Sequence, residues 1–300
     1  MKNWTDIRFF LTLYRCKTIL AAANELGVNH STVSRRISSL EYLLKTKLFE
    51  RTEKGCRPTL AAQELLPQAE KIESLTLGLE EIVSKRNNVI SGVIRIGAPD
   101  GVGSYFLTQR LPTFLDMHPQ IEIELVAIPM QLSTSNREVD ISITINRPTS
   151  GKILVRKLSN YRQGLFSTWA YMETHTKINK KEDLFEHDII SYIDDLLFEK
   201  SLKYLDDFLP GLTARYKSST IVGQRNSVLA GNGICVLPYF IANTDDRLIP
   251  VLPELFIERE YWLQLHADSK NSPKIRAIVD FIVDEFRSNK LAFMTHGRRI

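Results

Sequence analysis

Residues 21–41, with the sequence AAANELGVNHSTVSRRISSLE, constrain the fold of this chain more than any other stretch. Gly27 stands where a helix ends, because glycine readily takes the left-handed backbone of that position. Asn29 can then cap a second helix. Its apolar residues step by four, three and four along one stripe: Val33, Ile37, Leu40 and Leu44. Two short helices joined by such a turn form a helix-turn-helix, whose second helix enters the major groove of DNA. An ordinary helical hairpin with exposed arginines is the alternative.

The surrounding residues extend this stretch into a small basic head at residues 1–58. A capped amphipathic helix precedes it, and Thr18 can cap the helix at 19–26. Two short extended runs, at 47–51 and 56–58, flank a turn and predict a β-wing. The first sixty residues carry eleven Lys and Arg against five Asp and Glu, whereas the remaining 240 carry a net charge of −2. A basic head on a near-neutral body favours a polyanionic partner.

Polar side chains outside the apolar stripe are the candidates for contacts with DNA. Arginine can bridge the O6 and N7 atoms of guanine, and serine or threonine can reach phosphates or either base type. Basic residues of the wing can contact phosphates, which positions a protein without reading sequence. The candidate DNA-binding residues are Asn29, His30, Ser31, Thr32, Ser34, Arg35, Arg36, Arg51 and Lys54.

A long linker helix is predicted for residues 59–90. Its apolar residues recur about every 3.5 positions, the period of a coiled coil, and are Leu65, Ala69, Ile72, Leu75 (or Thr76), Leu79 and Ile82. A helix that projects from a small head cannot bury this stripe alone, so we expect a partner helix and a dimer. Packing of the stripe on the chain's own second domain is the alternative.

Strands alternate with helices from residue 91 to residue 300, which is typical of an open, mostly parallel α/β sheet. A first set of strands is expected at 92–97, 121–126 and 139–145, with helices at 102–118 and 273–293. A second set is expected at 188–192, 214–218, 233–237 and 261–266, with a helix at 222–230. Two similar sets predict a hinged clamshell, with lobe I at about 91–161 and 268–300 and lobe II at about 162–267.

The head resembles the winged helix-turn-helix of LysR-type transcriptional regulators. It contains the run AAxxLxVxxSTVSRxIxxLExxLxxxLFER with the family's spacing. Two departures are Asn29-His30, where a Ser-Gln pair is commoner, and Ala62, where glycine is common. The body is similar to the family's effector-binding domain, because GNGICVLP at 231–238 fits the pattern GxGxxxLP. The resemblance implies a winged helix-turn-helix head, a coiled-coil linker helix and a two-lobed α/β effector domain like that of periplasmic binding proteins.

Ligands of open α/β sheets bind beyond the carboxyl ends of the strands. That rule and the order of the lobes give the candidate effector-binding residues, which are Asp100, Gly101, Val102, Ser104, Pro129, Met130, Gln131, Thr144, Phe166, Ser167 and Asn226. The helix start after the first strand suits an anion. Asp100 at the same place discourages a simple anion, so the charge of the ligand stays open. These glycines and hydroxyls could instead only make turns and caps.

These features together predict a sequence-specific LysR-type regulator, whose dimer or tetramer binds promoter DNA and responds to a small-molecule effector in the cleft between the lobes. The expected partners are double-stranded promoter DNA, the effector, further copies of this chain and RNA polymerase. We expect no cofactor and no metal, because the three cysteines are scattered and no CxxC is present. We expect a cytoplasmic protein, associated with the nucleoid when DNA-bound and not with a membrane, since no apolar run is long enough to span one.

Two other classes of protein are the alternatives. An enzyme is disfavoured, because the sequence contains no GxSxG, HExxH or P-loop motif and its six histidines are dispersed. A transport-type solute-binding protein would account for the two lobes. It would not account for the basic head, and the N-terminus lacks the layout of a signal peptide.

Overall fold

The computed structural model of this chain describes residues 4–53, 55–86, 90–129, 134, 138–149, 152–197 and 199–297. The chain divides into two compact units, Met1–Asn88 and Val89–Ile300. Each unit has its own hydrophobic core.

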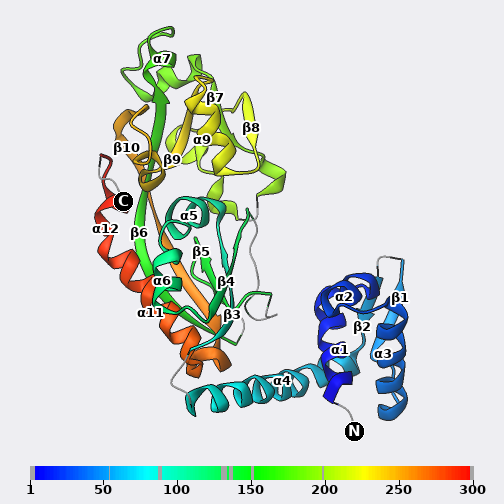
Figure 1. Cartoon of the computed structure of the whole chain (residues 1–300). Coiled ribbons are helices and arrows are strands. Elements are labelled where there is room, and N and C mark those ends of the chain that lie inside the picture. The colour runs from blue at the N-terminus through cyan, green and yellow to red at the C-terminus, as the bar shows by residue number, and fades with distance from the viewer. Residues whose placement is uncertain are drawn as a thin grey trace. The chain divides into compact units, whose positions relative to one another are not determined.

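The first unit contains three helices, a two-stranded wing and one long helix (Figure 1). In chain order these are α1 (Trp4–Cys16), α2 (Ile19–Leu26), α3 (His30–Leu44), β1 (Phe49–Thr52), β2 (Gly55–Pro58) and α4 (Leu60–Arg86). The hydroxyl oxygen of Thr18 accepts a hydrogen bond from the Ala21 N–H at 3.1 Å, and Gly27 ends α2 with φ at 65°. Both terminal signals of α2, and the wing itself, are confirmed.

Two expectations for α3 are wrong in detail. Asn29 takes the N-cap position and its carbonyl accepts a hydrogen bond from the Thr32 N–H at 2.9 Å, but its side chain makes no capping hydrogen bond. The apolar stripe does not continue to Leu44, which is 38% exposed. Glu41 is buried instead, since it receives backbone N–H groups from the start of the wing.

The first part of α4 packs on the head of its own chain. Ala62 and Ala69 are fully buried in the core of the first unit, and Leu65 packs against that core. The guanidinium of Arg15 on α1 makes two hydrogen bonds with the carboxylate of Glu73, at 3.0 and 2.7 Å. The predicted stripe is therefore partly used within the chain. The side chains at positions 79 and 82 lie outside the described residues.

The second unit contains one eight-stranded sheet in the order β4-β3-β5-β10-β6-β9-β7-β8. Its strands are β3 (Gly92–Ala98), β4 (Ile121–Ala127), β5 (Ile141–Thr144), β6 (Ile153–Thr168), β7 (Ile189–Tyr192), β8 (Tyr216–Ser218), β9 (Ile234–Pro238) and β10 (Leu248–His266). Its helices of four or more residues, excluding 3-10 and π turns, are α6 (Leu111–Met117), α7 (Trp169–Met172), α8 (Leu205–Phe208), α9 (Ile221–Leu229), α10 (Tyr239–Ala242), α11 (Pro273–Ser288) and α12 (Lys290–Met294).

The sheet is mixed, not mostly parallel. Strands β3, β4 and β5 are parallel at one end, and β7, β8 and β9 are parallel at the other. The long strands β6 and β10 run antiparallel to each other through both halves, as Figure 1 shows. Each long strand therefore adds an antiparallel neighbour to one set of parallel strands: β10 pairs with β5, and β6 pairs with β9.

The chain returns from the second set of strands to the first along β10, and it does so before the boundary expected at residue 267. Arg162 pairs with Glu258, and Tyr161 pairs with Arg259, so both strands pass between the halves at one level. The expected strand 261–266 thus belongs to the first half, where Leu265 pairs with Ile141 of β5. We call the β3-β4-β5 end the first half and the β7-β8-β9 end the second half.

The helix expected at 102–118 is interrupted. It consists of a short turn α5 (Asp100–Val102), a π-turn (Gly103–Leu107) and α6. A Cβ atom at Gly103 would lie 2.4 Å from the Cβ of Ala127, so glycine permits close contact with the end of β4. Pro112 in the first turn of α6 lacks an N–H and favours a new helix start there. The helix expected at 273–293 is likewise divided, at Asn289, into α11 and α12.

Candidate DNA-binding surface and effector cleft

The recognition helix α3 presents most of its predicted DNA-binding residues to solvent. Asn29, His30, Ser31 and Arg35 are exposed, and Thr32 and Ser34 are half-buried. On the wing, Arg51 is also exposed. Lys54 lies outside the described residues.

Arg36 is placed differently from its neighbour Arg35. Its guanidinium forms an ion pair with Asp6 of α1 at 3.2 Å, and it lies 6.0 Å from the centre of the Phe9 ring. The Asp6 side chain is only 6% exposed. A buried carboxylate requires such a partner, so Arg36 holds α3 against α1. Arg36 thus has a structural role within the head, and its contact with DNA stays a prediction.

One shallow groove brings together predicted residues that are far apart in the sequence. It has a volume of about 440 Å³ and is lined by His30 and Ser34 of α3 and by Arg51 of β1. Leu20 of α2, which is 67% exposed, forms part of the same groove. The groove thus combines cationic, hydroxyl and apolar side chains between the recognition helix and the wing, as contacts with phosphates and base edges require.

Glu41 fixes the wing to the recognition helix. Its Oε1 atom accepts hydrogen bonds from the Leu48 N–H at 2.9 Å and the Phe49 N–H at 3.2 Å, and its Oε2 atom accepts one from Lys47 Nζ at 2.6 Å. Burial alone would raise the pKa of Glu41, but these donors together outweigh burial and lower it. The carboxylate therefore stays ionised and holds β1 beside α3.

The described members of the predicted effector-binding set differ in their exposure. Ser104 and Asn226 are exposed, and Pro129 is half-buried. Met130 and Gln131 lie outside the described residues.

Three other predicted residues have structural roles. The hydroxyl of Thr144 donates to the Asn146 carbonyl at 2.8 Å, and the buried hydroxyl of Ser167 donates to the Gly233 carbonyl at 3.0 Å. Phe166 is fully buried within the second half, with its ring centre 5.1 Å from that of His296. These contacts favour the alternative interpretation, in which such residues hold the fold, and an effector contact at these three stays a prediction.

Asp100, Gly101 and Val102 do lie where the two halves meet. The Asp100 Oδ2 atom accepts a hydrogen bond from the Ile221 N–H, at the start of α9, at 2.8 Å. A Cβ atom at Gly101 would lie 3.0 Å from side-chain atoms of both Ile221 and Ile241. The first turn after β3 is therefore in direct contact with the second half.

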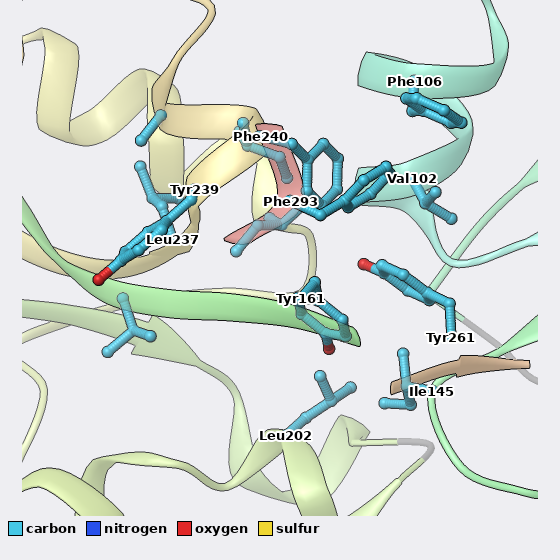
Figure 2. Packing of buried hydrophobic residues seen from close by; sticks show 14 of the residues in the cluster. Val102, Phe106, Ile145, Tyr161, Leu202, Leu237, Tyr239, Phe240, Tyr261 and Phe293 are labelled. Atoms are coloured by element: carbon cyan, nitrogen blue, oxygen red, sulfur yellow. The ribbon is translucent and has the colours of Figure 1, made fainter. Parts of the chain in front are cut away.

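Buried tyrosines fill the space beside Asp100. The rings of Tyr161 and Tyr261 stack with centres 4.2 Å apart. Figure 2 shows both among the packed buried side chains. Tyr192 and Tyr204 pack edge to face, with ring centres 5.9 Å apart. Burial raises the pKa of each of these four phenols, so all remain protonated hydrogen-bonding groups. Sequence reasoning identified none of them as cleft residues.

A cavity of about 220 Å³ lies in the second half beside this cluster. Tyr192 and Leu202 line it, and the ion pair between Asp194 and Lys217 stands at its edge. None of the described members of the predicted effector-binding set lines it. The sequence did contain a signal for this cavity. The rule that ligands bind at strand ends also points to Tyr192 and Asp194, at the carboxyl end of the strand expected at 188–192.

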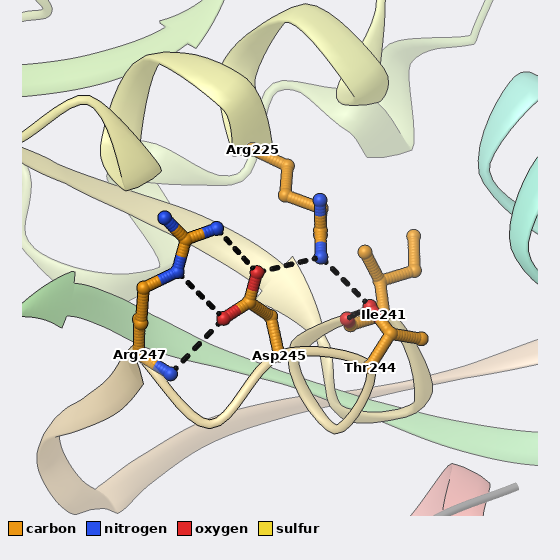
Figure 3. Close-up of polar contacts among 5 residues, drawn as sticks. All are labelled: Arg225, Ile241, Thr244, Asp245 and Arg247. Atoms are coloured by element: carbon orange, nitrogen blue, oxygen red, sulfur yellow. Dashed lines mark hydrogen bonds and ion pairs between the residues drawn. The ribbon is translucent and has the colours of Figure 1, made fainter.

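A second polar contact joins α9 to its surroundings. Arg225 of α9 bonds the Thr244 hydroxyl at 3.0 Å and lies 3.5 Å from a carboxylate oxygen of Asp245, as Figure 3 shows. The Arg247 guanidinium, with help from Arg225, lowers the pKa of Asp245 to about 2. Arg225 also lies over the ring of Tyr105 in the first half, 5.1 Å from its centre. Helix α9 thus contacts the first half at two points.

The described residues contain no group of three or more His, Cys, Asp or Glu side chains that could hold a metal ion. No helix among the same residues is both long and apolar enough to cross a membrane.

A winged helix-turn-helix joined to a two-halved α/β domain defines a DNA-binding regulator with a ligand-binding domain. Residues 4–63 match the bacterial regulatory helix-turn-helix protein, lysR family, and residues 87–287 match the LysR substrate binding domain. The chain therefore belongs to the family of LysR-type transcriptional regulators, which bind promoter DNA and small-molecule effectors and form oligomers. Members of the family are regulators, not enzymes.

Individual relatives are similar over nearly their whole length. The Mau operon transcriptional activator of Paracoccus denitrificans is 25% identical over 291 residues, covering 95% of this chain and 96% of the relative. The structure of CrgA from Neisseria meningitidis superposes with a TM-score of 0.58 at 20% identity, over 95% of this chain and 99% of CrgA. The full-length structure of AphB, a virulence activator of Vibrio cholerae, gives a TM-score of 0.56 at 18% identity, over 94% of this chain and 99% of AphB. At this identity the structural neighbours show the fold alone.

Proposed function

We propose that this LysR-type regulator reads its promoter with the exposed side of α3 and with the β1–β2 wing. The observation that carries the proposal is the groove lined by His30, Ser34 and Arg51, which joins the recognition helix to the wing. Arg35, on the same helix, is exposed. In this arrangement Arg35 and the residues at the start of α3 contact base edges, whereas the wing contacts phosphates. Arg36 supports the helix from within.

The dimer that places two such heads on one promoter would form through α4. The first part of this helix is covered by its own head, but Leu75 is 67% exposed and continues the apolar stripe. A ligand in the second unit would favour one arrangement of the assembly, because it binds that arrangement better. The DNA-bound assembly would contact RNA polymerase and would lie in the cytoplasm at the nucleoid.

The test is binding to the DNA upstream of the protein's own gene, measured by footprinting and by fluorescence anisotropy. Replacing Arg35 with alanine should cost about 1–3 kcal/mol of preference for the operator over unrelated DNA. Arg8→Ala is the matched control, since Arg8 is an exposed arginine of the same head that lies on α1. It should retain the preference.

The wing is tested separately by salt dependence. The logarithm of affinity should fall linearly with the logarithm of salt concentration, and Arg51→Ala should make that slope shallower by about one. Unchanged operator preference in the Arg35 variant would mean that α3 is not the reading helix. A salt slope near zero would refute DNA contact by the basic head.

A further inference from the structure

Asp100 lies between the halves of the second unit and contacts a helix end of the other half. Its side chain is only 4% exposed, and its Oδ2 atom accepts the Ile221 N–H at 2.8 Å. Ile221 begins α9, which has nine residues. The first N–H groups of a helix have no partner within it and carry partial positive charge. The carboxylate thus occupies the position where such a helix end would bind an external anion.

Backbone N–H groups are the donors that offset the cost of burying the Asp100 carboxylate. Among the described residues, no Lys, Arg or His forms an ion pair with it. Gly101 packs so closely on Ile221 and Ile241 that even a methyl group there would be crowded. The titratable side chains that interact electrostatically with Asp100 are the tyrosines at 105, 192, 204 and 261. An external anion at this point would meet both a filled position and a like charge.

A second buried polar side chain, that of Gln224 on α9, lacks one hydrogen-bond partner among the described residues. Gln224 is fully buried, and its Oε1 atom accepts a hydrogen bond from the Tyr204 hydroxyl at 3.2 Å. Its Nε2 atom has no hydrogen-bond partner among the described residues. Buried amide donors are nearly always paired in folded proteins. Gln224 therefore offers a donor for which none of the described residues supplies an acceptor.

We propose that Asp100 is a built-in anion of the effector cleft, and that the effector brings an uncharged hydrogen-bond acceptor, not a carboxylate or phosphate, to this part of α9. The proposal rests on the effector-binding role of the domain. Because Asp100 is covalently attached beside the helix end, its effective concentration there exceeds that of any free metabolite. Asp100 thus excludes anionic ligands from this position, and Gln224 selects ligands that carry a hydrogen-bond acceptor.

The test removes the built-in carboxylate and offers a free one. In Asp100→Ala the missing group has the size of formate, and in Asp100→Gly it has the size of acetate. Asp100→Asn is the matched control, because its amide oxygen can still accept the Ile221 N–H while the position stays filled. The full-length variants are melted in sodium formate, in sodium acetate and in sodium chloride of equal ionic strength.

We expect 100 mM formate to raise the melting temperature of Asp100→Ala by about 3–6 °C over chloride, as for a dissociation constant on the order of 10 mM. Acetate should do the same for Asp100→Gly, which keeps the test available if the alanine variant does not fold. The wild-type chain and Asp100→Asn should not respond.

Two results would overturn the proposal. One is a folded Asp100→Ala or Asp100→Gly variant that neither carboxylate stabilises beyond chloride. The other is a wild-type chain that formate stabilises as much as it stabilises the variant, because the position would then be open. Both measurements are independent of DNA, so failure of the proposed recognition surface would leave them unchanged. For the effector itself, Gln224→Leu should abolish the thermal shift produced by any uncharged ligand found in a metabolite panel, and a retained shift would refute the role of Gln224.

Discussion

Replacing Glu41 with alanine should release the wing from the recognition helix. This side chain is 7% exposed and holds the backbone N–H groups of Leu48 and Phe49, together with the ammonium group of Lys47. It thereby joins the last turn of α3 to the residues that lead into β1. The effect on stability should therefore be concentrated in the wing.

The magnitude follows from what each donor loses. The bond to Leu48 is buried, and an unsatisfied buried N–H costs about 1–3 kcal/mol. Phe49 is half-buried, so water compensates part of its loss, at roughly 1 kcal/mol. Lys47 is 76% exposed, and such a pair contributes about 0–1 kcal/mol. We expect the alanine variant to lose about 2–5 kcal/mol of local stability. Glu41→Gln keeps the Oε1 acceptor and should lose about 1 kcal/mol.

Hydrogen exchange of the wing amides in the full-length protein measures this directly. A loss of about 2–5 kcal/mol corresponds to roughly 30- to 5,000-fold faster exchange at Leu48 and Phe49 where local opening governs exchange. Operator affinity should fall in parallel, since the wing would no longer be held beside the groove. Unchanged exchange in the alanine variant would refute the assignment, and equal losses in the glutamine and alanine variants would show that charge, not the acceptor, holds the wing.

The pH dependence of the same comparison has a definite sign. Donors lower the pKa of Glu41 in the folded protein, against the opposing effect of burial. A carboxyl whose pKa is lowered by folding contributes stability above its unfolded pKa and loses it as pH falls through the folded value. The advantage of the wild-type wing over Glu41→Gln should therefore disappear in acid. An advantage that grew in acid would contradict this account.

Three other substitutions test separate contacts. Arg36→Ala should destabilise the first unit by about 1–3 kcal/mol in chemical denaturation, because it leaves a buried carboxylate on α1 unpaired, and it should reduce operator preference less than Arg35→Ala does. Arg15→Gln should loosen the attachment of the head to α4, because it breaks the bidentate contact with Glu73. Operators with one to three inserted base pairs should then be bound almost as well as the natural one. Unchanged discrimination between operator spacings would refute this. Burial is the largest influence on Asp100 and raises its pKa, so the wild-type chain should gain thermal stability relative to Asp100→Asn as pH falls from 7 toward about 4. A difference in melting temperature that does not depend on pH would contradict the last expectation.

The head could be predicted from the sequence because its signals are local. Thr18 and Gly27 each act through backbone groups within four residues, so their roles are visible in a short window. Contacts with distant segments were not visible in such a window. The sequence did not show that Glu41 would be buried against two N–H groups of the wing, nor that Arg36 would pair with a carboxylate thirty positions away.

The effector domain was predictable in its order of elements but not in its cleft. The crossing point depends on the register of β6 against β10, which pairs Tyr161 with Arg259, and no periodicity within either strand encodes that register. Phe166 and Ser167 were assigned to the cleft by their position near the crossing, yet both are fully buried in the second half. The strand-end rule pointed to Asp100, and the turn after β3 does contact the other half, whereas effector binding there stays a prediction.

Burial and backbone hydrogen bonds have opposite effects on the Asp100 carboxylate, and this affects how the cleft can respond to a ligand. Its burial raises the pKa of the carboxyl even though the N–H groups of Ile221, Val222 and Gly101 oppose the shift. The ionised contact between the halves is thus weaker than full compensation would make it. A contact reinforced by a lysine or arginine would resist a ligand, since effectors commonly supply only about 1–3 kcal/mol of coupling. We expect a carboxylate held by backbone donors alone to oppose such a shift less than an ion pair would, which favours a response of the halves to a ligand.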